Sequence, residues 1–326
     1  MKELVIMHTP RYRSMLWPKP IEKKTREKGK VGLVTLSAPE PAENPDAVER
    51  GVKWLKDRNW EPVFAGHFLQ SDGFLAASPQ QIAADLHALL QRPEVSWILS
   101  AGGGENSNSI LPYLDYRLIR KAKKPIIGLS NPSVILNAIA AKSKLVAFHG
   151  PVLLWNFGSE DGGVDPFTER HFWQMLGCSG NCTIKAERGW KWHRKGDAAG
   201  ILAGGNLWSI QQLLGTPYQP DWNGAVLFIE DCFCELHQVA AILEHFAAAG
   251  VLAIIGGLII GVPLEVAETE RVCAKGFDQI VMEICAPYDF PVLGNVHLGH
   301  TDRKLTLPVN GRVRLSSTLN AIEVIG

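Results

Sequence analysis

The sequence predicts an α/β protein built on a parallel sheet. From Val31 onward, short apolar segments alternate with amphipathic ones, and this alternation is typical of strands joined by right-handed helical crossovers. Several apolar segments run into glycine-rich or sharply turning stretches, as strands do at the carboxyl edge of such a sheet. The chain has 326 residues, more than one hydrophobic core usually serves, so we expect two domains.

Each element of the first half has a local signal. Strands are expected over short apolar runs, at 31–36, 61–65, 95–99, 125–127 and 144–149. Helices are expected over periodic or well-capped segments, at 45–58, 78–91, 109–120 and 133–140. Ser78 can cap the second helix, because Pro79 suits its first position and Gln81 completes a capping box.

The second half mixes strands and helices. Strands are expected near 199–203, 225–230, 253–260 and 291–296, and helices near 206–214, 235–249 and 268–285. A stretch rich in glycine, aspartate and aromatic residues, from about 155 to 180, indicates the domain boundary. The expected division is an arm (1–30), a parallel-sheet domain (31–160), a linker (161–185) and a C-terminal domain (186–326).

The overall composition argues against several classes of protein. Lysine plus arginine and aspartate plus glutamate number 33 each, so the balanced charge indicates no nucleic-acid partner. The basic arm lacks the apolar region of a signal peptide, and no apolar run is long enough to span a membrane. Six cysteines without paired spacing are expected to be free thiols, although Cys232–His237 could hold a soft metal. The expected location is the cytoplasm.

The segment 125–132 predicts a strand that breaks sharply into a helix with a serine at the break. Gly128 permits the turn, and Pro132 suits the first turn of the helix. Ser130 would then project into the crevice at the edge of the sheet, where the N–H of Asn131 can face an oxyanion. The alternative is that Ser130 only caps the helix.

Three other segments carry candidate chemistry. The glycine turn at 101–108 can present N–H groups to an anion, but it lacks the third glycine of a dinucleotide fingerprint; its alternative is a packed turn without a ligand. The strand at 225–229 delivers Glu230 and Asp231, of which Asp231 could instead cap a helix. His297 and His300 could be metal ligands, or one could be a general base. Serine, carboxylate and histidine at strand ends fit a Ser-Glu-His hydrolase.

At these segments the sequence resembles the LD-carboxypeptidase and microcin C immunity family of serine peptidases. The resemblance runs from about residue 30 to the C-terminus. It rests on the glycine turn, the elbow and the motifs at 108–116, 148–151, 204–207, 227–231 and 299–302. It implies a Rossmann-like N-terminal domain and a smaller, mixed α/β, β-barrel-like C-terminal domain. It also implies that no metal or other cofactor is needed, and that the protein is a cytoplasmic homodimer.

The family's site residues are carried over by position. The resemblance implies Ser130 as nucleophile, Glu230 as triad acid and His300 as general base, with Asp231 and His297 in supporting roles. It places the oxyanion hole on the N–H groups of Asn131 and Gly104. The remaining substrate-binding positions are Gly103, Glu105, Asn106 and Trp190.

Two departures from the family pattern bear on the substrate. Asn131 stands where the family usually has aspartate, and Gly102 stands where LD-carboxypeptidases have arginine. The turn at 103–108 looks closer to the microcin-immunity branch, in which a tryptophan at the spacing of Trp190 stacks on adenine. The alternative is that Trp190 packs between the domains.

The predicted function is therefore hydrolysis of aminoacyl- or peptidyl-nucleotides of the processed microcin C type, through an acyl-enzyme. One alternative is LD-carboxypeptidase action on murein tetrapeptide. Another is a non-catalytic protein that binds a nucleotide-like ligand. A nicotinamide-dependent oxidoreductase is disfavoured because the glycine fingerprint is broken.

Overall fold

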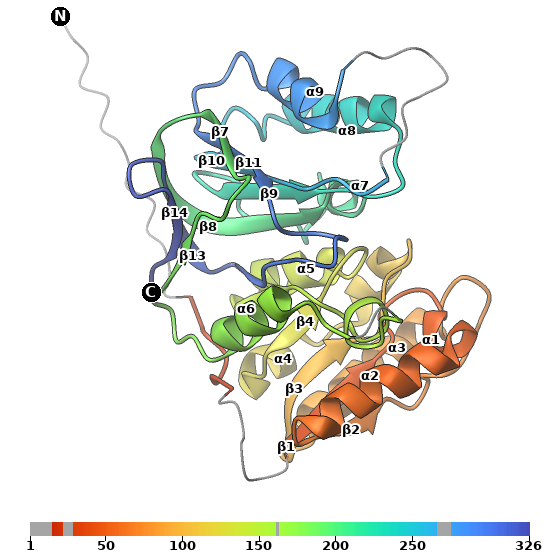
Figure 1. The fold of residues 1–326 in the computed structure, drawn as a ribbon. Helices are drawn as coiled ribbons and strands as arrows, with labels where there is room; N and C mark the ends of the chain where they lie inside the picture. Colours follow the sequence, from red (N-terminus) through yellow and green to blue (C-terminus); the bar gives the residue numbers. More distant parts are fainter. Residues whose placement is uncertain (1–14, 22–28, 161–162, 266–274) are drawn as a thin grey trace, which may run out of the picture.

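A computed structural model describes residues 15–21, 29–160, 163–265 and 275–326. The chain forms two sheets, one above the other in Figure 1, with helix α5 (Ser133–Ser143) between them. Most of the basic arm, Cys273 and the first part of the helix expected at 268–285 lie outside the described residues. The parallel-sheet α/β class predicted from the sequence is confirmed for the first sheet.

The first sheet has six strands in the order β12-β5-β4-β3-β1-β2. Its parallel strands are β1 (Gly29–Val34), β2 (Trp60–Phe64), β3 (Val95–Ser100), β4 (Ile126–Gly128) and β5 (Ala147–His149). The helices between them are α1 (Glu40–Glu43), α2 (Pro45–Asp57), α3 (Pro79–Gln91), α4 (Tyr116–Ala122) and α5. Ser78 and Gln81 form the predicted capping box at the start of α3.

One predicted helix of the first half is wrong in detail. The segment expected as a single helix at 109–120 is a 3₁₀-helix (Ser107–Tyr113) followed by α4. Pro112 has no N–H and cannot continue a regular helix. Asp115 then starts α4 afresh, because its carboxylate accepts from the N–H groups of Arg117 and Leu118.

The second sheet has eight strands in the order β6-β14-β13-β8-β9-β10-β11-β7. Its centre is the parallel run β8 (Asp197–Asn206), β9 (Val226–Glu230), β10 (Gly257–Gly261) and β11 (Val292–Val296). Antiparallel strands flank the run: β6 (Cys182–Lys185), β7 (Lys191–Arg194), β13 (Arg312–Ser316) and β14 (Ala321–Val324). The helices α7 (Leu207–Ile210), α8 (Leu236–Ala248) and α9 (Phe277–Ile284) accompany this sheet.

The chain passes between the two halves more than once. Strand β12 (Leu307–Val309), from the C-terminal part, pairs antiparallel with β5 of the first sheet. Helix α6 (Pro166–Leu176) lies in the segment expected to be a linker, yet its Trp173 stacks on Trp54 and Trp60 and meets the edge of Trp97. Strand β12 and helix α6, both later in the chain than the first domain expected from the sequence, therefore pack on the first sheet.

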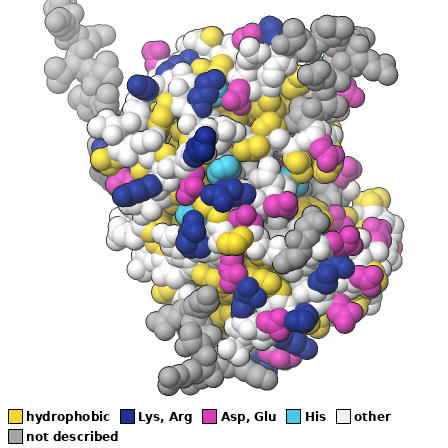
Figure 2. All heavy atoms as spheres, in the orientation of Figure 1, with side chains coloured by type: hydrophobic (Ala, Val, Ile, Leu, Met, Phe, Trp, Pro, Cys, Tyr) yellow, Lys and Arg dark blue, Asp and Glu magenta, His cyan; other side chains and the backbone are white. Residues whose placement is uncertain are grey.

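The surface offers no single dominant charge. On the face shown in Figure 2, acidic and basic side chains are interspersed. Among the helices of the described ranges, none has the length and apolarity needed to cross a bilayer.

Candidate active site

Ser130 stands on the predicted elbow between β4 and α5. Its backbone φ is +67°, a left-handed conformation that is strained for a residue with a side chain. A Cβ at Gly128 would lie 2.9 Å from the Cβ of Pro132, so the turn requires glycine there. No side chain of the described residues caps α5, so the alternative role of Ser130 as a helix cap is wrong.

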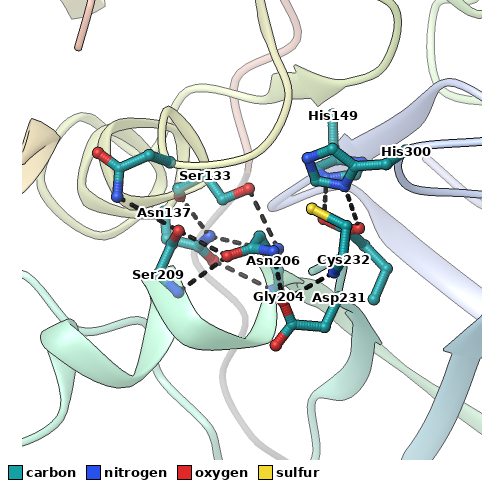
Figure 3. A network of polar contacts seen from close by, with 11 residues as sticks. Ser133, Asn137, His149, Gly204, Asn206, Ser209, Asp231, Cys232 and His300 are labelled. Carbon is teal, nitrogen blue, oxygen red and sulfur yellow. Dashed lines mark hydrogen bonds and ion pairs between the residues drawn. The ribbon is translucent and has the colours of Figure 1, made fainter. Parts of the chain in front are cut away.

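Helix α5 docks against the end of β8. The side chain of Asn137 donates a 2.7 Å hydrogen bond to the carbonyl of Gly204 and accepts a 3.2 Å bond from its N–H. The N–H of Asn206 donates to the Ser133 hydroxyl at 3.3 Å (Figure 3). A Cβ at Gly205 would overlap Ser133, so glycine permits this close approach. Since β9 pairs with β8, this docking brings the elbow toward the end of β9.

Glu230, at the end of β9, is hydrogen-bonded to His300. The two side chains meet at 2.7 Å between Glu230 Oε2 and His300 Nδ1, and both are almost fully buried. Burial opposes ionisation of Glu230, but its interactions with the rings of His300 and His149 outweigh burial and hold the Glu230 pKa well below its usual range. The carboxylate therefore stays ionised and fixes the orientation of the His300 ring.

Two further basic groups lie buried close to Glu230. His149 Nε2 is 3.7 Å from Glu230 Oε1, longer than a hydrogen bond, and burial lowers the pKa of His149, so the ring is neutral. Lys304 is almost fully buried as well, and burial lowers its pKa to about 8. The charge of Glu230 opposes that shift. Because this attraction is mutual, Lys304 favours the charged form of Glu230.

Ser130 and His300 line one cavity of about 600 Å³. The indole of Trp155 lies beside His300 and close to Gly103, which borders Ser130. Its ring centroid lies 5.6 Å from that of His300, and a Cβ at Gly103 would be 2.5 Å from Trp155 Cη2 and 2.9 Å from Ser130 Oγ. The other described residues that line the cavity are Glu40, Gly104, Glu105, Asn206, Trp208, Asp231, Cys232, Phe233, Cys234, Gln238, Leu264 and Asp302.

The glycine turn after β3 faces the nucleophile with backbone amides. Within the described ranges, the N–H groups of Gly104 and Asn131 have no hydrogen-bond acceptor. The N–H of Gly103, in contrast, donates a 2.9 Å bond to Glu40 Oε2. Gly104 has a φ of +135°, which favours glycine, and a Cβ there would crowd Ser37 and Ala38. The N–H groups of Gly104 and Asn131 are thus free to donate to an anion, whereas that of Gly103 is not.

The side chain of Asn131 joins this turn to the second sheet. Its Oδ1 accepts from the hydroxyl of Ser37 at 3.0 Å and from the N–H of Ser107 at 2.6 Å, and its Nδ2 donates to Ser209 at 3.3 Å. A neutral amide both donates and accepts in this buried place, as an ionised aspartate could not. The change from the family's usual aspartate therefore fits its surroundings.

Asp231 follows Glu230 and lines the cavity. Its Oδ1 accepts from the side chain of Asn206 at 3.0 Å and from the N–H of Cys232 at 2.9 Å. Burial, reinforced by the charge of Glu230, raises the pKa of Asp231 to about 6. Glu235 caps α8, so the alternative in which Asp231 caps the helix is wrong.

Several predicted residues lie elsewhere. Glu105 lines the cavity, whereas Asn106 precedes the 3₁₀-helix and its carbonyl accepts from Ser109. Trp190, between β6 and β7, is half-buried against the core and is not among the described residues that line the cavity. His297 is half-buried with its ring 5.8 Å from that of Phe167, also outside the cavity lining. Asn106, Trp190 and His297 are thus outside the described lining of the cavity that contains Ser130.

Glu40, Trp155, Trp208 and Phe233 are among the cavity-lining residues that the sequence reasoning missed. Trp208 and Phe233 are exposed by 43% and 69%, and Phe233 has a strained φ of +55°. The sequence around these missed residues indicates no site, because each stands in a segment that is easily taken for a helix cap or a linker. Among the described residues, no group of three or more His, Cys, Asp or Glu side chains could hold a metal ion. The soft-metal site considered at Cys232–His237 is therefore not formed by the described residues.

The fold and the cavity define a hydrolase of the serine peptidase class, with a serine elbow on a parallel sheet and a buried acid–histidine pair from a second sheet. The family models of the LD-carboxypeptidase N-terminal domain and C-terminal domain match residues 31–150 and 199–315. The chain therefore belongs to the LD-carboxypeptidase family of serine peptidases.

Three relatives illustrate the range of this family. A putative carboxypeptidase of Vibrio cholerae is 29% identical over 86% of this chain and 90% of its own. A probable murein peptide carboxypeptidase of Bacillus subtilis is 26% identical over 90% and 92%. The microcin C7 self-immunity protein MccF of Escherichia coli is 25% identical over 87% and 90%.

A solved structure supports the fold. A tryptophan-to-phenylalanine mutant of MccF, in complex with adenosine monophosphate, superposes with a TM-score of 0.87 at 24% identity. The match covers 96% of this chain and 99% of that one. This likeness confirms the two-sheet architecture.

Proposed function

We propose that the protein hydrolyses acyl compounds with Ser130 as nucleophile, His300 as general base and Glu230 as the acid that orients His300. The observation that carries the proposal is that Ser130 and His300 line one cavity while His300 is hydrogen-bonded to buried Glu230. This arrangement provides a nucleophile from the elbow after β4, a carboxylate from the end of β9 and a base from the loop after β11.

The proposed reaction follows from these groups. Nε2 of His300 takes the proton of the Ser130 hydroxyl as Oγ attacks the acyl carbon. The amides of Gly104 and Asn131 donate to the oxyanion that forms on the carbonyl oxygen. His300 then gives its proton to the leaving group as the bond to the acyl carbon breaks. Water, deprotonated by His300, hydrolyses the resulting acyl-enzyme and frees Ser130.

The preferred substrate in this proposal is an aminoacyl- or peptidyl-nucleotide of the processed microcin C type. Two exposed aromatic rings at the cavity, Trp208 and Phe233, offer stacking surfaces to a nucleobase. Structures of the relative MccF carry glutamyl sulfamoyl guanosine and aspartyl sulfamoyl adenosine, which are ligands of that chemical kind. Trp190 is outside the described cavity lining, so a nucleobase stacked on it would have to extend beyond this cavity.

The second candidate is LD-carboxypeptidase action on murein tetrapeptide. The name of the Bacillus subtilis relative supports it. Gly102 weighs against it, because glycine stands where LD-carboxypeptidases are expected to have an arginine. An arginine there could pair with the free carboxylate of a peptide.

The test compares wild-type protein and Ser130→Ala on an aminoacyl-sulfamoyl adenosine and on murein tetrapeptide. We expect hydrolysis of the nucleotide, a loss of at least about 10³-fold in rate with Ser130→Ala, and retained binding of the intact nucleotide. Cleavage of murein alone would favour the second candidate. Binding by the wild type without turnover of either compound would instead indicate a protein that only binds its ligand.

Assembly and location also remain predictions. The family resemblance implies a cytoplasmic homodimer. Sedimentation equilibrium on the purified chain tests the dimer directly, and a monomer at micromolar concentration would contradict it.

A further inference from the structure

Glu40 places a carboxyl group beside the nucleophile. It lies in the short helix α1, after the loop that follows β1, and its side chain lines the cavity together with Ser130 and His300. Its Oε2 accepts the 2.9 Å hydrogen bond from the N–H of Gly103. The Cβ position of that same glycine is 2.9 Å from Ser130 Oγ, so the carboxyl and the hydroxyl flank a single residue.

The carboxyl of Glu40 occupies space that a side chain at position 102 would otherwise fill. A Cβ added to Gly102 would overlap Glu40 Oε2. Glycine at this position and glutamate at position 40 are thus sterically matched. The space beside position 102 is therefore filled by the Glu40 carboxyl group, which reaches the turn from another segment of the chain.

The charges around the cavity favour a cationic group of the substrate at this point. Four acidic side chains line the cavity, Glu40, Glu105, Asp231 and Asp302, and none of the described lining residues is lysine or arginine. Only Glu40 is bonded to the glycine turn that borders the nucleophile. A substrate cation near the scissile carbonyl would therefore meet Glu40 first.

We propose that Glu40 binds the free α-ammonium group of the acyl part of the substrate and so narrows the proposed substrate class: it selects aminoacyl-nucleotides over peptidyl-nucleotides, whose α-amine is acylated. The α-nitrogen of an aminoacyl group is two bonds from the carbonyl carbon that Ser130 attacks. When the carbonyl oxygen faces the amide of Gly104, that nitrogen is within reach of the adjoining turn, where the Glu40 carboxyl stands. A charge-assisted hydrogen bond between ammonium and carboxylate holds the acyl group in place.

The protonation behaviour of Glu40 agrees with this role. Burial raises the pKa of Glu40 to about 7, so the free enzyme holds a carboxyl group that is easily protonated near neutrality. An ammonium ion beside it favours the ionised form. The group thus gains its partner when the substrate binds, and no permanent cation of the protein competes for it within the described lining.

This inference rests on the proposed function and is tested with a matched pair of substrates. The pair is alanyl-sulfamoyl adenosine and its N-acetyl derivative, and kcat/KM is measured for wild type, Glu40→Gln and Glu43→Gln. Glu43 is the matched control, because it is an exposed glutamate of the same helix. Glu40→Asp is a second variant, which keeps the charge on a shorter side chain.

We expect the wild type to prefer the free amine by about 10- to 100-fold, the range typical of one charge-assisted bond. Glu40→Gln should remove most of that preference by lowering kcat/KM for the free amine alone, and Glu40→Asp should retain part of it. Glu43→Gln should behave as wild type.

Two results would overturn the inference while leaving the hydrolase intact. One is a wild type that hydrolyses both compounds equally well, a measurement that does not depend on any variant folding. The other is a Glu40→Gln variant that slows both compounds by the same factor, which would indicate that Glu40 only supports the turn. Failure of the wild type on both compounds, with cleavage of murein tetrapeptide, would instead reject the proposed function and the inference with it.

Discussion

His300 Nδ1 and Glu230 Oε2 are 2.7 Å apart, and the Glu230 side chain is fully buried while that of His300 is 7% exposed. The carboxylate comes from the end of a central strand, and the imidazole comes from a loop about seventy residues later. Because the pair is buried, the ring has one preferred orientation, with its other nitrogen left for the cavity.

Replacing Glu230 by glutamine should disable the proposed base without removing its hydrogen-bonding capacity. A neutral amide cannot stabilise the imidazolium that forms during attack, so we expect kcat to fall by about 10³- to 10⁴-fold. Asp231→Asn is the comparison, because Asp231 bonds Asn206 and Cys232 and not His300. Steady-state kinetics on the aminoacyl-nucleotide measure both variants. Equal losses would argue that Glu230 has no special role.

A methyl group at position 103 should block the nucleophile. In Gly103→Ala the new Cβ would lie 2.9 Å from Ser130 Oγ and 2.5 Å from Trp155, too close for both to stay in place. We expect kcat/KM to drop by about 10²-fold or more, since small displacements of reacting groups are costly. Gly276→Ala is the control, because a Cβ there meets nothing within 4 Å. Wild-type rates for Gly103→Ala would contradict this geometry.

The aromatic residues at the cavity should affect nucleobase affinity. Phe233→Ala and Trp208→Ala each remove an exposed ring, and stacking on a base contributes about 1–3 kcal/mol. We therefore expect Kd for adenosine monophosphate to rise by about 5- to 100-fold, measured by calorimetry. Trp190→Ala tests the competing prediction from the family resemblance. If only Trp190→Ala weakens binding, the base lies outside the cavity described for the single chain.

Glu40 and Asp231 should each contribute stability that is lost between mildly acidic and neutral pH. The Glu40 pKa rises from 4.5 to about 7 and the Asp231 pKa from 3.8 to about 6 on folding, mainly through burial. Between these limits the unfolded chain has released protons that these two groups still bind in the folded chain. Their contribution to the free energy of unfolding therefore decreases as pH rises through this window and levels off above about pH 7.

Denaturant unfolding at pH 5 and at pH 8 measures this effect. Glu40→Gln should remove a part of the difference on the order of 1–3 kcal/mol, because glutamine does not titrate. The lowered pKa values of Glu230, His149 and His171 have the opposite sign, and those of the two histidines act up to the ordinary histidine value of 6.5. The contribution of Glu40 is therefore measured as the difference between wild type and variant. A Glu40→Gln variant with the same pH dependence as the wild type would show that Glu40 is not buried as described.

The sequence alone determined the strand–helix alternation, the serine elbow and the capping box of α3. These features are local: glycine at a tight turn, serine before proline at a helix start, and short apolar runs are set by neighbouring residues. The resemblance to a family added the expected partners of Ser130. Local rules also explain the misjudged helix at 109–120, since Pro112 interrupts it within its own sequence.

Only the tertiary structure decided which side chains share the cavity. The approach of α5 to β8 depends on the glycine at 205 and on the bonds of Asn137 to the backbone of Gly204, none of which a local pattern reveals. The same is true of Glu40, which reaches the glycine turn across more than sixty residues of chain. Trp190 shows the opposite case, because its spacing matched the family's stacking tryptophan but its side chain is half-buried against the core. Packing decides such positions because it depends on contacts between distant segments, and spacing along the chain carries no record of them.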